Sequence, residues 1–476
     1  MPRRQPPCIN ACRRLQMIQA MEQDERRTHA ASIGRRAVVV GAGVAGLATA
    51  GALAKSFSEV VVLERDDLPD RPAQRRGTSQ GWHAHGILMG GQIALLELFP
   101  GIDQDFLRAG AVLLRASQDL REEWPNRDPM PQRDLGMIAY TMSRPLIEST
   151  LRRRNLQLGN VAFWPNTQVT GLEFEGQRVT GVRCATADDA AEHILQANLV
   201  VDASGRGELT GALLQAIGYK RPSESSVGID MYYSTAVLDI PDNAPADWKM
   251  VLTHPDAPYS HRRAVMLPIE GNRWMMSVAG RGTEKPPAEW DALLAYIKHL
   301  PTATIYNAVK HSRPVDRLAR FFLPESIWRH YEQLELFPDG LIPVGDAICR
   351  FNPVYGQGMS VAAKAAVLLR RLLRDRAAQP DPLSGLGKAF FAQATPLIET
   401  PWTMAAIPDF VYPDTRGHRP PDLERSLLAA AALSRIAVRD AAVQKSAVEV
   451  WHLVKPRSVL QHPDLMQRVE EEMVRA

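Results

Sequence analysis

Short runs of consecutive apolar residues, each followed by glycine or an acidic residue, dominate the first part of the chain. Ala37–Val40 leads into Gly41, and Val60–Leu63 leads into Glu64. Unbroken apolar runs of this length are typical of strands that are buried on both faces of a parallel sheet. An Ala- and Leu-rich stretch between the two runs has the character of a helix. The pattern therefore predicts a strand–helix–strand unit over residues 34–66.

A long polar segment follows this unit. Residues 67–91 form a loop rich in Arg, Gly and His, which leads into an apolar helix near Gly91–Phe99. Residues 119–136 carry four prolines or glycines among charged residues, so we expect an exposed excursion there.

Three further elements complete the first half of the chain. Residues 140–154 predict the end of a strand and then a helix, whose first turn tolerates Pro145. Apolar and polar residues alternate on both sides of Glu175–Gln177, which predicts a hairpin. The apolar run within residues 197–207 again ends in an acid and glycines.

The pattern changes in the second half. Strand-like stretches rich in Val, Ile, Met, Tyr and Trp lie at 227–240, 262–269 and 272–280, joined by Pro-rich loops. They are typical of a mostly antiparallel sheet. Residues 341–376 then return to the first pattern, with an apolar strand, an acid, a loop and a long amphipathic helix. We therefore predict an α/β fold in which a second sheet is inserted into a Rossmann-like domain.

The last part of the chain, residues 385–476, reads as largely helical. The stretch 423–443 has a wide apolar face that must be buried. We expect it to pack within the chain; a cap over the active site, a dimer contact and a membrane surface are the alternatives. Arg425, Arg435 and Arg439 do not make its polar face strongly basic.

Composition excludes several classes of protein. The chain has 476 residues, enough for two or three domains, with 45% hydrophobic and 23% charged residues. Residues 1–36 hold eight Arg against three acids, a net charge of +5, so the rest carries −2 of the total +3. The basicity therefore lies in a tail, and a nucleic-acid-binding face is not indicated. We expect the tail to be a disordered extension; an overlong start and an Arg-rich organelle-targeting segment are the alternatives. Four cysteines make no disulfide framework, and no apolar run is long enough to span a membrane.

Gly41, Gly43 and Gly46 stand at the spacing of a dinucleotide-binding turn directly after the first strand. In such a turn the three glycines permit the tight bend, the approach of a pyrophosphate and close packing of the helix. Glu64 ends the second strand, 23 residues after Gly41, where an acid binds a ribose hydroxyl. These features together predict a cofactor that contains ADP; the alternative is a glycine-rich turn without a ligand.

Three strand ends point to one cofactor: Glu64, Asp202–Gly207 and Gly345–Asp346. The sequences GAGVAGLATA, VVDASGRG and PVGDAICRFNPVYGQGMSVA resemble the three fingerprints of FAD-dependent monooxygenases with the para-hydroxybenzoate hydroxylase fold. The resemblance covers about residues 36–460. RRGTSQGWHAHGILMGG and TPWTMAAIPDF are similar to a branch that contains bacterial epoxidases and hydroxylases of polyketide and terpenoid biosynthesis.

The resemblance implies a division of the chain into four regions. Residues 34–220 and 318–384 would form the FAD-binding domain, and residues 221–317 would form the inserted, substrate-binding sheet domain. A disordered basic extension over 1–33 would precede them, and a helical region over 385–476 would follow.

The resemblance also implies roles for residues at the flavin end. Asp346, after Gly345, would accept a hydrogen bond from a ribityl hydroxyl of FAD. The loop Pro353–Met359 would bring backbone N–H groups to the pyrimidine edge of the flavin, where a helix N-terminus suits the negative charge of the reduced ring. Gly356 and Gly358 would leave room for the flat ring, with Gln357 between them. The alternative role for Asp346 is that of a helix cap.

Further contacts are implied nearer the nucleotide. Asp202 would act near the pyrophosphate, and Arg144, at the head of its helix, would reach the phosphates; a turn residue and a surface arginine are the respective alternatives. Arg65, Arg76, Gly77 and Gln80 are the remaining cofactor candidates implied by the resemblance.

His83-Ala84-His85 has the spacing of some metal ligands, but no accompanying cluster of Cys, His or carboxylate residues is evident. We therefore expect no metal, and in the resembled branch this loop lies against the flavin.

No catalytic triad or pair of carboxylates stands out, as expected if FAD performs the chemistry. The resemblance implies an enzyme that activates O2 as a flavin C4a-hydroperoxide and hydroxylates or epoxidises a hydrophobic small molecule, in secondary metabolism. Such chemistry needs a desolvated pocket. Candidates for its wall are residues of the inserted sheet: Met231, Tyr232, Tyr233, Met266, Trp274 and Met276. For each, a place in the ordinary core is the alternative.

Several questions stay open at this stage. The chain has no second dinucleotide-binding unit, so either NAD(P)H docks transiently at the flavin or a separate flavin reductase supplies electrons. The alternative function is an FAD-dependent reductase or dehydrogenase similar to geranylgeranyl reductases. A halogenase ranks third because the Trp-x-Trp-x-Ile-Pro segment of flavin halogenases is absent, and a non-catalytic flavoprotein ranks below it. We expect a cytoplasmic monomer or homodimer.

Overall fold

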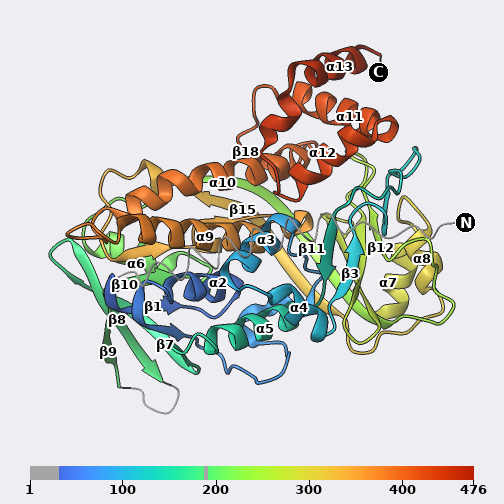
Figure 1. Ribbon diagram of the computed structural model, residues 1–476. Helices are drawn as coiled ribbons and strands as arrows, with labels where there is room; N and C mark the ends of the chain where they lie inside the picture. The colour runs from blue at the N-terminus through green and yellow to red at the C-terminus, as the bar shows by residue number, and fades with distance from the viewer. Residues whose placement is uncertain (1–31, 187–190, 476) are drawn as a thin grey trace, which may run out of the picture.

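The computed structural model describes residues 32–186 and 191–475, and these form two sheets with helices around them (Figure 1). The expected disordered extension over 1–33 lies almost wholly outside the described residues. Cys8 and Cys12 lie there too. Within the described residues, no helix is both long enough and apolar enough to cross a membrane.

The first sheet is parallel, with the strand order β16–β10–β1–β2–β6. Its strands are β1 (Gly34–Val40), β2 (Phe57–Leu63), β6 (Val161–Trp164), β10 (Leu199–Asp202) and β16 (Leu341–Pro343). Val40 lies in register with both Leu63 and Asp202, and Asp202 with Pro343. The carboxyl ends of four strands therefore meet at one edge, although up to about 300 residues separate them, as a doubly wound sheet requires.

Each face of this sheet is covered, which explains the unbroken apolar runs. Helices α2 (Val44–Leu53), α5 (Arg144–Leu156) and α9 (Gly358–Arg376) pack on the face that carries Val39, Val60 and Val62. The other face meets the small sheet of β7 (Thr167–Glu175), β8 (Arg178–Thr186) and β9 (His193–Gln196). The strand–helix–strand unit and the hairpin predicted from the pattern are thus confirmed.

The connections near this sheet are also helical. α3 (Met89–Leu98) and α4 (Ile102–Arg108) follow the 3₁₀ segment η1 (Arg76–Trp82), and α6 (Glu208–Ala216) follows β10. β3 (Val112–Arg115) and β5 (Ile138–Thr141) pair with each other just before α5. Ser143 caps α5 by accepting a hydrogen bond from the N–H group of Leu146, with Pro145 in the first turn as predicted.

The second sheet has the order β17–β15–β11–β14–β13–β12–β4 and is mostly antiparallel. Its strands are β4 (Leu120–Glu123), β11 (Glu224–Asp239), β12 (Met250–Thr253), β13 (Arg263–Ile269), β14 (Arg273–Arg281), β15 (Ala319–Arg329) and β17 (Cys349–Arg350). The short strand β18 (Arg416–Gly417) pairs with β11. One face packs on α7 (Trp290–Ile297) and α8 (Thr304–Val309).

Two segments join the second sheet although the sequence analysis placed them elsewhere. β15 follows residue 318, where we expected the chain to return to the FAD-binding domain, yet it pairs with β11 over ten residue positions. Part of the excursion 119–136 forms the edge strand β4. Both strands satisfy backbone groups along the edges of β11 and β12, which would otherwise lack partners.

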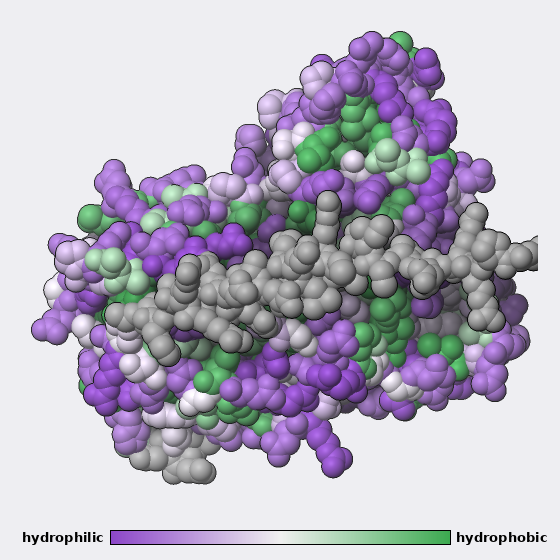
Figure 2. Space-filling model, viewed as in Figure 1, coloured by the Kyte–Doolittle hydropathy of each residue, from purple (hydrophilic) through white to green (hydrophobic). Residues whose placement is uncertain are grey.

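The C-terminal helices α10 (Leu386–Asp409), α11 (Leu423–Arg439), α12 (Ala441–Trp451) and α13 (Pro463–Val474) lie beside and above α9 (Figure 1). The second half of the apolar face of α11 packs within the chain: Ile436 is buried with Val443 and Leu465, and Met130 of the excursion packs against them, whereas Leu428 in the first half is 46% exposed. Arg133 of the excursion donates hydrogen bonds to the carbonyl groups of Ala437 and Val438. Hydrophilic residues surround the apolar ones on the surface of these helices (Figure 2).

Candidate active site

The glycine turn joins β1 to α2, and its three glycines differ in their steric surroundings. Gly41 has a φ of +108°, a conformation that L side chains rarely adopt. A Cβ atom on Gly46 would lie 1.9 Å from the carbonyl oxygen of Gly41, so only glycine lets the helix approach this closely. A Cβ atom on Gly43 would meet only Nη2 of Arg144, at 3.5 Å. The backbone at Gly43 is therefore open toward a guanidinium group, as a phosphate site requires.

Glu64 is buried at the end of β2 and faces the glycine turn. Its Oε2 accepts a hydrogen bond from the N–H group of Ala42 at 2.8 Å. The same oxygen lies 3.0 Å from Nη1 of Arg75. The acid thus ties the second strand to the turn, and Arg75 neutralises its charge.

Arg75 is the central residue here that the sequence analysis missed. Its guanidinium group is almost fully buried, donates hydrogen bonds to Glu148 and to the carbonyl oxygen of Ala42, and contacts Glu64. Burial opposes its charge, but Glu148 and Glu64 outweigh burial and raise the pKa of Arg75. The adjacent Arg76, which we had selected, is exposed. Two neighbouring arginines carry no local signal that distinguishes them.

Arg144 begins α5 with its side chain largely buried, and its Nε donates to Glu148 at 2.8 Å. Glu148 therefore holds Arg75 and Arg144 together beside the glycine turn. Burial raises the pKa of the Glu148 carboxyl, but the two guanidinium groups outweigh burial, so its pKa is lowered. Glu64 and Glu148 balance the charges of Arg75 and Arg144, so the feature that suits a pyrophosphate is the Nη2 donor of Arg144 beside the open backbone of Gly43.

The four remaining cofactor candidates near the nucleotide end differ in how far they are buried and in their contacts. The N–H group of Gly77 donates to Asp66 at 2.6 Å, and a Cβ atom there would lie 3.2 Å from Nε of Arg65. Gln80 is half-buried in η1. The side chains of Arg65 and Arg76 are exposed at the rim of this region.

Both carboxylate oxygens of Asp202 accept hydrogen bonds from neighbouring residues of the chain. Oδ1 accepts from the N–H and hydroxyl groups of Ser204, and Oδ2 accepts from the N–H and hydroxyl groups of Thr210. Its side chain is fully buried. The carboxylate therefore shapes the turn between β10 and α6, which is the turn role that we had weighed as the alternative to a cofactor contact.

Asp346 contrasts with Asp202. It follows Gly345, whose φ is +61°, at the carboxyl end of the sheet. Burial raises the pKa of its carboxyl, and Arg144, Arg350 and Arg329 act against this through charge alone. No described residue donates a hydrogen bond to this carboxylate. A carboxylate held among protein groups without a donor fits a ligand hydroxyl, such as that of a ribityl chain.

The loop from Pro353 to Met359 passes this carboxylate and leads into α9. Gly356 adopts a left-handed conformation with φ of +66°. A Cβ atom on Gly358 would lie 3.9 Å from Oδ1 of Asp346. Between them Gln357 is 1% exposed, and neither its amide nitrogen nor its amide oxygen has a hydrogen-bond partner. Buried amides are normally paired, so this one also fits an absent ligand.

The loop with the two histidines reaches the second sheet. Nδ1 of His83 lies 2.7 Å from the hydroxyl of Thr235, and the N–H group of Ala84 donates to Ser277 at 2.8 Å. Burial lowers the pKa of His83 to about 4 and that of His85 to about 3. Both imidazoles are therefore neutral near pH 7. Within residues 32–186 and 191–475, no three His, Cys, Asp or Glu side chains gather as a metal site would require.

The expected wall of the substrate pocket divides between the two faces of the second sheet. Met231 and Tyr233 lie on the face that meets the cofactor loop, where Val354 packs against their cluster. Met266, Trp274 and Met276 lie on the opposite face, fully packed against α7 and α8. The latter three lie in the core beside α7 and α8, which is the alternative that the sequence analysis gave for each of them. Tyr232 also points away from Tyr233, because neighbouring residues in a strand alternate.

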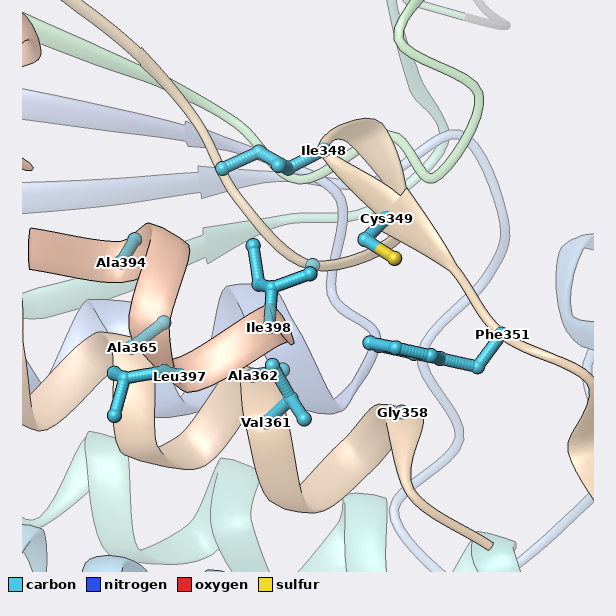
Figure 3. A pocket seen from close by; sticks show the side chains of 11 residues that line it. Ile348, Cys349, Phe351, Gly358, Val361, Ala362, Ala365, Ala394, Leu397 and Ile398 are labelled. Atoms are coloured by element: carbon cyan, nitrogen blue, oxygen red, sulfur yellow. The ribbon is translucent and has the colours of Figure 1, made fainter. Parts of the chain in front are cut away.

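A small apolar pocket lies behind the turn that carries Asp346 (Figure 3). Its walls come from α9 and α10 and from the segment between β16 and the cofactor loop: Gly345, Ile348, Cys349, Phe351, Gly358, Val361, Ala362, Ala365, Ala394, Leu397 and Ile398. In Figure 3 the ring of Phe351 points toward Ile398, and Ile348 lies above them. Gly345 and Gly358 belong to the pocket lining, which offers no polar side chain apart from the buried thiol of Cys349.

Comparisons with known proteins agree with this geometry. The family "FAD dependent oxidoreductase" matches residues 36–160. The solved structure of the flavin-dependent brominase Bmp2 superposes with a TM-score of 0.63 at 16% identity, covering 93% of this chain and 99% of that one. PqsL, a probable FAD-dependent monooxygenase from Pseudomonas aeruginosa, superposes with a TM-score of 0.56 at 18% identity, covering 78% and 96%. Fold and site thus define an FAD-dependent oxidoreductase with the para-hydroxybenzoate hydroxylase-like fold.

A closer relative comes from the curated sequences. Protein Rv3254 of Mycobacterium tuberculosis is 35% identical over 403 residues, which cover 79% of this chain and 80% of that protein. The chain therefore belongs to the same family as Rv3254.

Proposed function

We propose that this protein is an FAD-dependent monooxygenase that transfers one oxygen atom of O2 to a small organic molecule. Bound FAD would supply the redox chemistry, taking electrons from a donor and activating O2. The chain's own residues would hold and shield it. Arg144 and the open backbone at Gly43 would bind the pyrophosphate, Glu64 with Arg75 would order the turn, and Asp346 would bind the ribityl chain.

One contact carries this proposal. The hydroxyl of Tyr233, in the middle of the second sheet, donates to Oδ1 of Asn352 at 3.1 Å. Asn352 directly precedes the proposed flavin loop, and its Oδ1 also accepts a hydrogen bond from the N–H group of Val354 in that loop. A substrate held on this face of the sheet would therefore lie against the flavin ring, with water excluded by the residues buried around it.

The experiment measures O2 uptake and determines whether oxygen from O2 enters the product. We expect the purified protein to be yellow, and substrate to stimulate O2 uptake with NADPH, NADH or a flavin reductase as donor. With isotopically labelled O2, the product should carry one labelled oxygen atom. A substrate that is reduced under anaerobic conditions, without oxygen in the product, would replace this function with that of a reductase. A chlorinated or brominated product would show a halogenase.

The reductase alternative has its own support. The probable electron transfer flavoprotein-quinone oxidoreductase YdiS of Escherichia coli is 27% identical over 194 residues, 40% of this chain and 42% of that protein. The name of that protein describes electron transfer rather than oxygen insertion, so the anaerobic arm of the experiment is needed.

A further inference from the structure

The face of the second sheet beside the cofactor loop carries a buried group of charges that the proposed function has not used. Arg281 at the end of β14 donates to Oδ1 of Asp409 at 2.7 Å, and both side chains are 1% exposed. Asp409 also accepts hydrogen bonds from Asn352 and from the hydroxyl of Tyr355. This carboxylate, at the end of α10, is therefore fully engaged.

Arg263 at the start of β13 lies beside this pair and has no carboxylate of its own. It is 9% exposed, and its Nε has no hydrogen-bond acceptor. Its polar neighbours are the phenol hydroxyls of Tyr355 and Tyr412, which carry no charge near pH 7, and Asp409. The nearby His261 is neutral, because burial and Arg281 lower its pKa.

The buried charges therefore do not balance. Two guanidinium groups face one carboxylate, and a buried cation without a counter-ion is costly. Of the two further acids nearby, Glu284 is already paired with Arg262 at 3.0 Å, and Asp414 is exposed, 3.9 Å from Nε2 of His261. An anion that entered this region would remove the imbalance.

The surroundings indicate what kind of anion would fit. The strand register places Arg263, Ala279, Tyr233 and Phe321 in one row across the sheet. One end of the row is cationic, and the rest is apolar and aromatic. Tyr233 and Tyr355 also link this row to the residues around the proposed flavin loop. A molecule with a carboxylate at one end and an apolar body would match both parts.

We propose that Arg263 binds the carboxylate of an organic-acid substrate on this face of the sheet. The proposal rests on the proposed function for the role of the bound acid as substrate. It also changes the substrate class expected from the sequence, from a hydrophobic molecule to an amphipathic acid. Arg281 is already paired with Asp409, so we assign it a role in positioning Asp409 and not in binding the substrate.

The test measures binding to the FAD-loaded protein by calorimetry and by the change in the flavin absorption spectrum. The probes are acetate, benzoate and 2-naphthoate, each paired with its uncharged amide. We expect at least one acid to bind at least about tenfold more tightly than its amide, a difference of about 1.4 kcal/mol. In Arg263→Met the ratio should fall to near one, and Arg263→Lys should restore part of it.

Arg262→Met is the matched control, because Arg262 is the adjacent residue and its charge is already paired with Glu284. It should keep the wild-type ratio. If no acid of the series binds more tightly than its amide to the wild type, the proposal is wrong, even if Arg263→Met does not fold. An unchanged ratio in a folded Arg263→Met variant would also overturn it.

The outcomes separate this site from the proposed function. Acid-selective binding without oxygen uptake would support the site and contradict the monooxygenase. Oxygen insertion into a neutral substrate, with no preference for acids, would support the monooxygenase and contradict the acid-binding site at Arg263.

Discussion

Substitution of Asp346 by Asn tests the candidate flavin site most directly. The change keeps the size of the side chain and one acceptor oxygen but removes the charge. A hydrogen bond to a charged group contributes about 1.5–3 kcal/mol. If the carboxylate binds a ribityl hydroxyl, Asp346→Asn should weaken FAD binding by about 10- to 150-fold, because each 1.4 kcal/mol is about a factor of ten. Titration of the FAD-free protein with FAD, followed by fluorescence quenching, measures this change.

The same substitution should have the opposite effect on the FAD-free protein. Burial raises the pKa of this carboxyl, so its ionised form costs folding free energy at pH values above its unfolded pKa. Asp346→Asn should therefore raise the melting temperature near neutral pH. The gain should shrink as the pH falls through the raised pKa of the folded carboxyl, and it should be lost below the unfolded pKa of about 3.9.

Asp375→Asn provides the matched control, because Asp375 lies at the far end of α9 in an exposed pair with Arg374. It should change neither FAD affinity nor melting temperature measurably, since exposed pairs contribute little. An Asp346→Asn variant that bound FAD like the wild type, with an unchanged melting temperature, would refute our reasoning about this carboxylate.

Three further predictions concern residues around the same site. Gly43→Val should fold with a melting temperature near that of the wild type but lose FAD affinity. Gly46→Ala should instead lower the free energy of unfolding by about 1–3 kcal/mol, because its Cβ atom would meet the backbone at 1.9 Å. Thermal melts and FAD titrations distinguish the two variants, and equal stabilities would contradict the steric argument. Asp202→Asn should cost about 1–3 kcal/mol of stability through lost acceptors, while the folded fraction keeps its FAD affinity; a large loss of affinity in that fraction would instead make Asp202 a cofactor contact. Burial lowers the pKa of His83 to about 4, so its folded state resists protonation and stability is lost as the pH falls from about 6.5 toward 4. His83→Phe should flatten this loss by up to about 1.4 kcal/mol per pH unit in denaturant titrations, and an unchanged slope would show that other groups cause it.

Local patterns were sufficient for the elements of the first domain. The first unit shows a local pattern for each of its parts within about thirty residues. These parts are a strand buried on both faces, a turn that only glycine fits and a helix packed close behind it. The helix that begins at Arg144 and the hairpin around Gly176 were equally clear, because capping and alternation are local. The return of the strand that ends at Pro343 to the same sheet was indicated by the reappearance of the first pattern over residues 341–376, and the register of the strands confirms it.

Local patterns did not predict which face of the second sheet lies toward the flavin. Alternation places Tyr232 and Tyr233 on opposite faces, but it does not say which face meets the flavin. That depends on the register among β11, β13 and β14, which long-range hydrogen bonds decide. For this reason alternation alone did not show that Met266, Trp274 and Met276 lie on the face that packs on α7 and α8.

The amino-acid sequence by itself thus determined the nucleotide-binding unit, the α/β class and the insertion of a second sheet, because backbone geometry and burial impose these patterns locally. Only the tertiary structure decided which charges meet. Arg75 rather than Arg76 lies among the acids, Asp202 is satisfied while Asp346 is not, and Arg263 stays without a carboxylate. Each of these depends on partners far away in the chain, and a buried charge has its energetic meaning only once those partners are in place.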